Sequence, residues 1–366
     1  MLPVGEHWDL SLRTLGARAV RKALADSGNL QPDAIYIGNG LANILSHQAN
    51  LGALISDEAG FPGIESCTFE AAGASGAAAF RAACMAVQSG LVDIAIALGV
   101  EKITECDGST AQAAQDLILN YEFEGTNGLT VSAGAAIIAQ RYLSEYHLDR
   151  SVFQNIALQS YQHAQGNPYA MYRNGITEAI YQKQPMKNHP LGLFDVSSLA
   201  DGAAALVVTR EELIPEESRD DMIRVLGSAN AIAPLSLHDR HQLLQYRAAS
   251  QSAASALRKA GLSLSNMDLL EIWDAHAIDV VLAMEAIGLA IEGEGWQTDM
   301  TTLSSMGGCL GRGNPLGASS AYQLVETVLQ MRGEAGACQI GNLPKTAFVQ
   351  SLGGLGSTAI THILGH

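Results

Sequence analysis

The chain has 366 residues, 48% hydrophobic and only 16% charged, which excludes disordered, collagen-like and coiled-coil proteins and predicts one or two well-packed domains. Its net charge of −16 removes the basic surface that attracts nucleic acids and anionic membranes, and no apolar run reaches the ~20 residues of a membrane helix, so we expect neither partner. The five cysteines are an odd number without a CxxC pair, which indicates neither disulfides nor a metal site and favours a reducing cytoplasm.

In chain order, the first expected element is an amphipathic helix that stops at Gly28, where glycine suits a left-handed cap. A short loop, Asp33 and an apolar strand follow it. A second helix opens at GASGAAAF (73–80) and stops at Gly90, before the strand IAIALGV (94–100). Near-continuous apolar strands that alternate with helices predict buried sheets covered by helices, which is an α/β class of fold.

Three features of the first half recur in the same order in the second half, which indicates a duplicated chain. The pairs are a helix–Asp–strand unit at 20–40 and 254–274, a small-residue helix start at 73–80 and 317–324, and a strand start at 202–210 and 356–364. Similarity of alanine- and glycine-rich helices by chance explains one such pair, but not the shared order of all three.

The spacing of these features predicts an insert in the first half. From the helix start to the strand start the distance is 129 residues (73 to 202) in the first half and 39 residues (317 to 356) in the second. An insert of about 90 residues, at roughly 105–195, is therefore expected to lie over one face of the molecule. The charged, proline-containing segment 211–222 is the expected link, which divides the chain into halves at 1–218 and 219–366.

The longest motifs resemble those of the thiolase superfamily, and most of all its sterol-carrier-protein-type and archaeal acetoacetyl-CoA thiolase branch. The resemblance covers nearly the whole chain and is carried by GEHWDLSLRTL, IYIGNG, EAAGASGAAAFRAA, LGVEKIT, NPYAMYRNGIT, PLGLFDVSSLADGAAALVV, GRGNPLGASSAYQLVE and QSLGGLGSTAITHIL. It implies a duplicated five-layer α/β fold (α-β-α-β-α), usually dimeric, with an inserted loop domain that helps bind coenzyme A. It also implies acyl-CoA C-acyltransferase chemistry in lipid metabolism, with coenzyme A as substrate or ligand and no separate cofactor.

The mechanism of that family depends on a cysteine at the tip of a buried helix, whose N-terminus favours the thiolate that attacks a thioester. The family reads Cys-Ala-Ser-Gly where this chain reads GASG, so the resemblance places Gly73 at the nucleophile position. Glycine cannot form an acyl-enzyme, and we therefore expect acyl transfer to be altered or lost. Cys84 lies eleven residues further along the same helix and is expected to be a core thiol.

Two further catalytic positions depart from the family. The Gly-His-Pro motif becomes GNP, and Asn314 can hold a thioester oxygen but cannot take a proton near neutral pH. The His-Asp-Cys-Phe motif becomes WDAH, in which Trp273 offers an N–H donor and His276 is either a proton carrier or a core histidine. The C-terminal turn of the family survives at Gly354, where glycine lets backbone N–H groups approach a ligand.

Two alternatives to an altered acyltransferase stay open. A cysteine-independent retro-aldolase on a CoA thioester needs a base for a β-hydroxyl and stabilisation of an enolate, with His276, Asp274 and His163 as candidate bases. A non-catalytic structural subunit of a thiolase-type complex needs neither, and its site can fill with apolar side chains. Since the branch often works with a small OB-fold zinc-ribbon protein, the resemblance implies such a partner beside a homodimer.

The resemblance also implies contacts with coenzyme A from His163, Asn167 and Arg173 in the insert and from Ser75 at the helix start. A plain turn and a solvated charge are the alternatives for the residues of the insert. His47, His189 and His238 are interpreted as having no partner at metal-ligand spacing, so no metal is expected. Relatives begin with an apolar strand before the segment that matches 3–5. Without it, either the first sheet is expected to lose a strand or the chain start is clipped.

Overall fold

The computed structural model describes residues 1–214, 216, 219 and 222–366. The predicted boundary between 218 and 219, and part of the predicted link at 211–222, lie outside the described residues. The division into two halves at that point therefore stays a prediction, whereas the repeated architecture on either side of it can be compared element by element.

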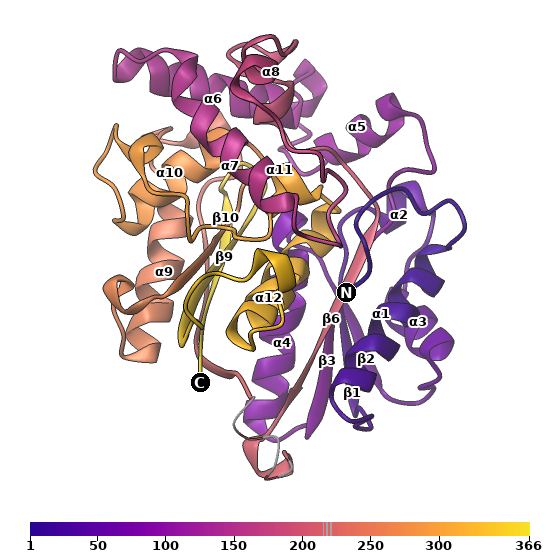
Figure 1. The fold of residues 1–366 in the computed structure, drawn as a ribbon. Coiled ribbons are helices and arrows are strands. Elements are labelled where there is room, and N and C mark those ends of the chain that lie inside the picture. Colours follow the sequence, from indigo (N-terminus) through magenta and orange to yellow (C-terminus); the bar gives the residue numbers. More distant parts are fainter. Residues whose placement is uncertain (215, 217–218, 220–221) are drawn as a thin grey trace.

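The described strands form two four-stranded sheets with matching connections (Figure 1). The first has the order β2 (Glu65–Phe69), β1 (Ala34–Gly38), β3 (Ile94–Glu101), β6 (Gly202–Thr209), and the second has β7 (Arg224–Ile232), β10 (Thr358–Gly365), β9 (Thr346–Gly353), β8 (Leu269–Ile272). β1 is parallel to β3 and β3 is antiparallel to β6, just as β8 is parallel to β9 and β9 is antiparallel to β10. This shared three-stranded unit confirms the predicted duplicated α/β fold.

Helices cover both faces of each sheet and give five layers (Figure 1). The outer helices are α1 (Leu12–Asp26) and α3 (Leu51–Ala59) on one side and α9 (Arg247–Ala260) and α10 (Ala277–Ile287) on the other, with α4 (Ser75–Ser89) and α12 (Leu316–Met331) between the sheets. From α4, Arg81 reaches Ser228 of β7 and Phe80 packs edge-on against His362 of β10. The start of α4 is thereby fixed deep inside the molecule, where apolar side chains of both halves meet.

The predicted insert occupies the chain between β3 and β6, where the second half has a short turn between β9 and β10. It contains α5 (Gly108–Asp116), α6 (Val131–Glu145), α7 (Gln154–Ala164), α8 (Glu178–Gln182) and the hairpin β4 (Met186–Asn188) and β5 (Leu191–Gly192), which lie at the top of Figure 1. Buried side chains of α6 and α7 share one core with α9 and α10, and the hydroxyl of Tyr142 donates to Glu285 (2.6 Å). The insert of the first half thus packs on the second half.

Asp201 fixes both ends of the insert and the start of the chain. Its buried carboxylate forms an ion pair with Lys102 (3.0 Å) and accepts backbone N–H groups from Ile103, Thr104 and His7. These donors hold the pKa of Asp201 below its usual range despite its burial. Before α1 the start of the described chain runs beside β6, where the Leu2 N–H donates to the Ala203 carbonyl (2.9 Å) and Gly5 forms an isolated antiparallel bridge with Asp201. The expected loss of a strand from the first sheet stays a prediction.

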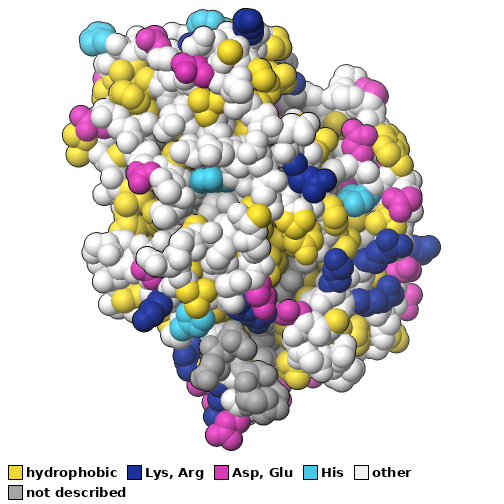
Figure 2. Space-filling view, in the orientation of Figure 1, with side chains coloured by type: hydrophobic (Ala, Val, Ile, Leu, Met, Phe, Trp, Pro, Cys, Tyr) yellow, Lys and Arg dark blue, Asp and Glu magenta, His cyan; other side chains and the backbone are white. Residues whose placement is uncertain are grey.

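The surface mixes side chains of all kinds. Figure 2 shows acidic and hydrophobic side chains spread over one face, with several Lys and Arg side chains gathered at the right of the view. Among the helices of the described part of the chain, none combines the length and the apolar character that crossing a membrane requires.

Candidate functional site

The tip of α4 is reached through a strained turn. Gly73 lies in a 3-10 turn (Ala72–Ala74) directly before α4, and the preceding residue Ala72 has φ of 50°, in the left-handed region. A non-glycine residue in that region costs on the order of 1–2 kcal/mol. The Glu70 carboxylate accepts the Ala72 N–H (2.7 Å) and helps to hold this conformation. The fold therefore keeps a costly backbone geometry next to Gly73.

The indole of Trp273 fills the space beside Gly73. A Cβ atom added to Gly73 would overlap the six-membered ring of Trp273 and would lie 2.8 Å from the carbonyl oxygen of Leu352. Trp273 is itself 3% exposed, at the point where the chain leaves β8. Gly73 and Trp273 thus fit one another, and residue 73 has no room for a side chain while the indole is in place.

The turn between β9 and β10 closes the other side of the tip. Gly353 lies directly against the carbonyl of Ala71, so close that a side chain there would overlap this carbonyl oxygen. Gly354 follows with φ of 62° and reverses the chain into β10. The structure therefore brings the predicted residues Gly73, Trp273 and Gly354 into one neighbourhood.

Asn314 is buried and its carboxamide is engaged at both ends. Its Nδ2 donates to Ser197 Oγ (2.9 Å), and its Oδ1 accepts from Ser319 Oγ (2.7 Å). Its backbone pairs with the chain around Leu199, and Leu316, two residues on, has φ of 27°. Asn314 is thus held rigidly beside a second strained turn, with one Nδ2 hydrogen left over for another acceptor.

His276 is connected to Asn314 through one short segment of the insert. Val196 forms a bridge with His276, and the N–H of Ser197 donates to the carbonyl of Ala275 (2.8 Å). Ser197 is the residue that also accepts from Asn314. The ring of His276 lies with Nδ1 2.8 Å from Asp279 Oδ2, a contact that sequence reasoning missed although Asp279 is three residues further on.

Asp274 is not an available base, contrary to one of the sequence-based options. Its carboxylate accepts the N–H groups of Cys309 (2.5 Å) and Leu310 (3.2 Å), at the start of the short helix α11 (Gly308–Arg312). Burial raises its pKa to about 6, and the two N–H groups oppose that rise. Asp274 therefore holds α11 in place instead of facing a ligand.

The four residues predicted to contact coenzyme A are dispersed. Ser75 is fully buried and caps the tip by donating to the Ala72 carbonyl (2.6 Å). Asn167 is also fully buried, and its Nδ2 donates to Met306 and Glu326. His163 is half-buried with Nδ1 3.3 Å from the Ser304 carbonyl, and Arg173 is exposed. Ser75 and Asn167 are engaged in hydrogen bonds within the protein, and contact of any of the four residues with coenzyme A stays a prediction.

A buried ionic cluster that the sequence did not reveal lies behind the site. Arg312 and Glu326 form an ion pair in which both side chains are fully buried. Both carboxylate oxygens of Glu271 are buried without a hydrogen-bond partner among the described residues. Burial, and then the nearby Glu326 carboxylate, raises the pKa of Glu271 well above its usual value. A glutamate inside the apolar strand LLEI was the one available signal.

Cys84 and Cys309 offer no substitute at the tip. Cys84 lies further along α4, where burial raises the pKa of its thiol to about 12. Cys309 is fully buried next to Asp274, and its pKa is also raised well above the usual range by burial. Since the thiolate is the nucleophile, both thiols are held in an unreactive form.

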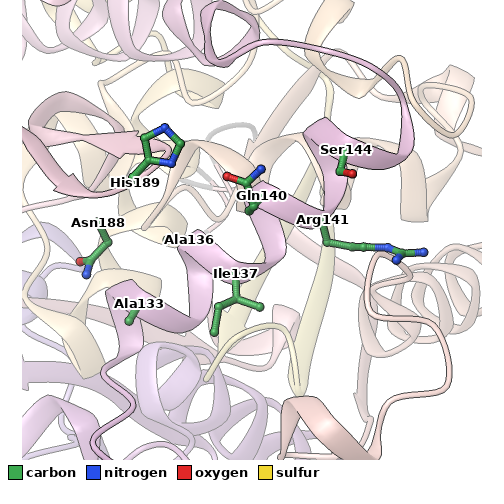
Figure 3. Close-up of a pocket in the computed structure, with 8 residues that line it drawn as sticks. All are labelled: Ala133, Ala136, Ile137, Gln140, Arg141, Ser144, Asn188 and His189. Atoms are coloured by element: carbon green, nitrogen blue, oxygen red, sulfur yellow. The ribbon is translucent and has the colours of Figure 1, made fainter.

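A hollow of about 570 Å³ lies on the insert, away from these residues. Figure 3 shows it along α6, with Asn188 and His189 of the neighbouring hairpin facing Ala133 and Gln140. None of its lining residues is among the predicted site residues.

Two family models match the chain. The thiolase N-terminal domain matches residues 1–188, and the thiolase C-terminal domain-like model matches residues 229–366.

Relatives match over nearly the whole chain. The acetyl-CoA acetyltransferase of Methanothermobacter thermautotrophicus is 35% identical over 98% of this chain and 96% of its own length. The benzoylsuccinyl-CoA thiolase subunit BbsB of Thauera aromatica is 29% identical over 96% of this chain and 92% of its own. Among solved structures, the Ltp2–ChsH2(DUF35) aldolase superposes with a TM-score of 0.81 at 21% identity, covering 99% of this chain and 94% of that one.

Proposed function

This chain belongs to the thiolase family, and we propose that it acts on acyl-CoA thioesters by making or breaking a carbon–carbon bond without forming an acyl-enzyme. The observation that carries the proposal is the fit of Trp273 against Gly73, which leaves no room for a nucleophilic side chain at the helix tip. In the family that this chain resembles, acyltransferase activity requires a nucleophilic cysteine at the position that Gly73 occupies here. We therefore infer altered chemistry on the same class of substrate.

Cleavage of a 3-hydroxyacyl-CoA is the reaction that needs no covalent intermediate. A base removes the β-hydroxyl proton, the bond between Cα and Cβ breaks, and the electron pair goes to the thioester as an enolate. The former β-carbon leaves as an aldehyde or ketone. The enolate then takes a proton at Cα and gives a shorter acyl-CoA, so that atoms and charge balance. What the protein must supply is a proton carrier and hydrogen-bond donors for the enolate oxygen.

Several features support retained chemistry. Ala72 and Leu316 keep positive φ on either side of the site, and such strain persists where the surroundings enforce it, often at functional positions. The indole N–H of Trp273 donates to no acceptor among the described residues, and its nitrogen keeps some accessible surface. It is therefore available to a thioester oxygen. The spare Nδ2 hydrogen of Asn314 is a second donor of the same kind.

The comparisons support a partner protein. The similar solved aldolase is a complex with a DUF35 protein, and we infer that this chain works with a small protein of that type, as well as with a second copy of itself. We place the complex in the cytoplasm and in the metabolism of acyl-CoA lipids. His163 and Arg173 are our candidates for contact with coenzyme A.

A second candidate function is that of a non-catalytic subunit, which the enclosure of the site favours. Trp273, Asn314 and His276 are each less than 5% exposed. A subunit of this kind would use the fold as an interaction surface, and its active partner would carry the complete cysteine and histidine set.

Exchange of the α-protons of an acyl-CoA separates the two candidates without knowledge of the natural substrate. The protein, purified with any partner it holds, is incubated in D2O with acetyl-CoA and with propionyl-CoA, and deuterium at Cα is measured by mass spectrometry. We expect incorporation above the rate given by the heat-unfolded protein, because enolate formation is one half of the proposed reaction. Exchange no faster than in that control would overturn the proposed catalysis and leave the non-catalytic subunit.

A further inference from the structure

Two buried histidines differ in what their rings can do. His362 is fully buried, both of its ring nitrogens lack a partner, and burial lowers its pKa to about 3. His276 is 4% exposed, and its Nδ1 contacts Asp279. Its Nε2 is not fully enclosed, in contrast to the ring nitrogens of His362. Within the described chain Nε2 makes no hydrogen bond, so this nitrogen keeps accessible surface. His276 is therefore the buried histidine whose ring is both anchored and available.

Asp279 determines how the ring of His276 is protonated. Its Oδ2 accepts the backbone N–H of His276 (3.1 Å) and lies 2.8 Å from Nδ1, while its Oδ1 accepts the hydroxyl of Tyr246 (2.7 Å). Because both oxygens of Asp279 accept hydrogen bonds, the nitrogen that faces Oδ2 must be a donor. In the neutral ring of His276 the hydrogen therefore lies on Nδ1. Nε2 then carries the free lone pair, which is the arrangement of a general base held by an acid residue.

The network reaches the turn that faces the helix tip and, on its other side, the segment that holds Asn314. The ring of Tyr246 packs against Gly356, and the guanidinium of Arg240 donates to the Leu355 carbonyl (2.7 Å), in the same turn whose start faces the helix tip. In the other direction the backbone of His276 pairs with Val196, and the next residue, Ser197, accepts a hydrogen bond from Asn314. His276 thus lies between the β9–β10 turn and Asn314.

We propose that Nε2 of His276 is the proton carrier of this site and that Asp279 and Tyr246 are its positioning residues. The inference rests on the proposed function and names the base that it lacks. In the cleavage direction Nε2 takes the β-hydroxyl proton as the carbon–carbon bond breaks. The same nitrogen then returns a proton to Cα of the enolate, and the imidazole is neutral again.

Helix capping accounts for part of this geometry but not for all of it. Asp279 is the third residue of α10, where a carboxylate that accepts the N–H of the preceding cap residue is ordinary. That contact requires neither the ring of His276 nor the hydroxyl of Tyr246. A capping role predicts a loss of stability on substitution, whereas a positioning role also predicts a change in how activity depends on pH.

The α-proton exchange assay distinguishes these roles. For His276→Gln we expect exchange to fall by about 100-fold or more, because glutamine cannot carry the proton. For Asp279→Asn we expect a loss of at least about 10-fold and a changed pH–rate profile, because the variant removes the carboxylate that contacts Nδ1 of the ring. Tyr246→Phe should give a smaller loss in the same direction. The charged and titratable groups in this network are Asp279, Tyr246, Arg240 and, across Arg240, Glu124.

The control is His238→Gln, since His238 is exposed and lies outside this network. A measurement that needs no substrate accompanies the assay. With 15N-labelled histidine, the wild-type protein should show an Nδ1–H ring besides that of His163, whose Nδ1 faces the Ser304 carbonyl; this second signal should be lost in His276→Gln and altered in Asp279→Asn. Full exchange activity in His276→Gln, or an unchanged pH–rate profile in Asp279→Asn, overturns the inference and leaves the proposed function standing. Absence of exchange in the wild-type protein overturns both.

Discussion

Replacing Gly73 by alanine is expected to lower the free energy of unfolding by about 1–3 kcal/mol, the range for forcing extra atoms into a packed core. The added Cβ must displace the Trp273 ring or the Leu352 carbonyl, and neither is the end of a flexible chain. Urea unfolding at 25 °C measures the loss. The matched control is Gly108→Ala at the start of α5, where an added Cβ meets nothing within 4 Å and little change is expected.

The same position provides a double-mutant cycle with Trp273. Trp273→His removes the six-membered ring, so Gly73→Cys should cost at least about 1 kcal/mol less in that background than in the wild type, as expected for residues in direct contact. Equal costs in both backgrounds would show that the two residues do not compete for one space. The single variant Gly73→Cys is expected to regain no acyl transfer, because the indole stays in place.

Replacing Glu271 by glutamine is expected to make the protein more stable relative to the wild type as the pH rises. The folded-state pKa of Glu271 is raised, by burial first and then by the Glu326 carboxylate. The neutral Glu271 side chain makes its full contribution to the free energy of unfolding below the unfolded-state pKa of about 4.3. That contribution is lost as the pH rises towards the folded-state pKa. Glutamine cannot ionise, so the difference should grow as the pH rises above about 4.3, by at most about 1.4 kcal/mol per pH unit.

Urea unfolding of both proteins at several pH values within that range measures this difference. Glu334→Gln is the matched control, because Glu334 is exposed and should show the same pH dependence as the wild type. Parallel stability curves for the wild type and Glu271→Gln would show that Glu271 is charged in the folded protein, with a partner that compensates its burial.

The fold was predictable because its signals are local and repeated. The caps at Gly28 and Gly261, the apolar strands and the small-residue helix starts each occur twice, and unequal spacing between the repeats located the insert. The resemblance added the layer order, which the two sheets with α4 and α12 between them confirm.

The site was predictable only in part, because its decisive contacts join residues far apart in the chain. From the sequence, Gly73 and Trp273 are two separate departures from the family motifs. The structure shows that they are linked, because the Trp273 ring fills the space that a side chain at position 73 would need. Similarly, Tyr246 reaches Asp279 across 33 positions, and no spacing rule connects them. Asn167 donates to Glu326 of the buried ionic cluster, a contact that forms only when the insert packs on the second half.

The measurement that tests the central claim most directly is the intact mass of the protein during incubation with acetoacetyl-CoA and free coenzyme A. A site in which Trp273 occupies the place of the nucleophile predicts an unchanged protein mass and no thiolytic formation of acetyl-CoA. An acyl adduct on any of the five cysteines, removable by hydroxylamine and formed as fast as acetyl-CoA appears, would contradict it.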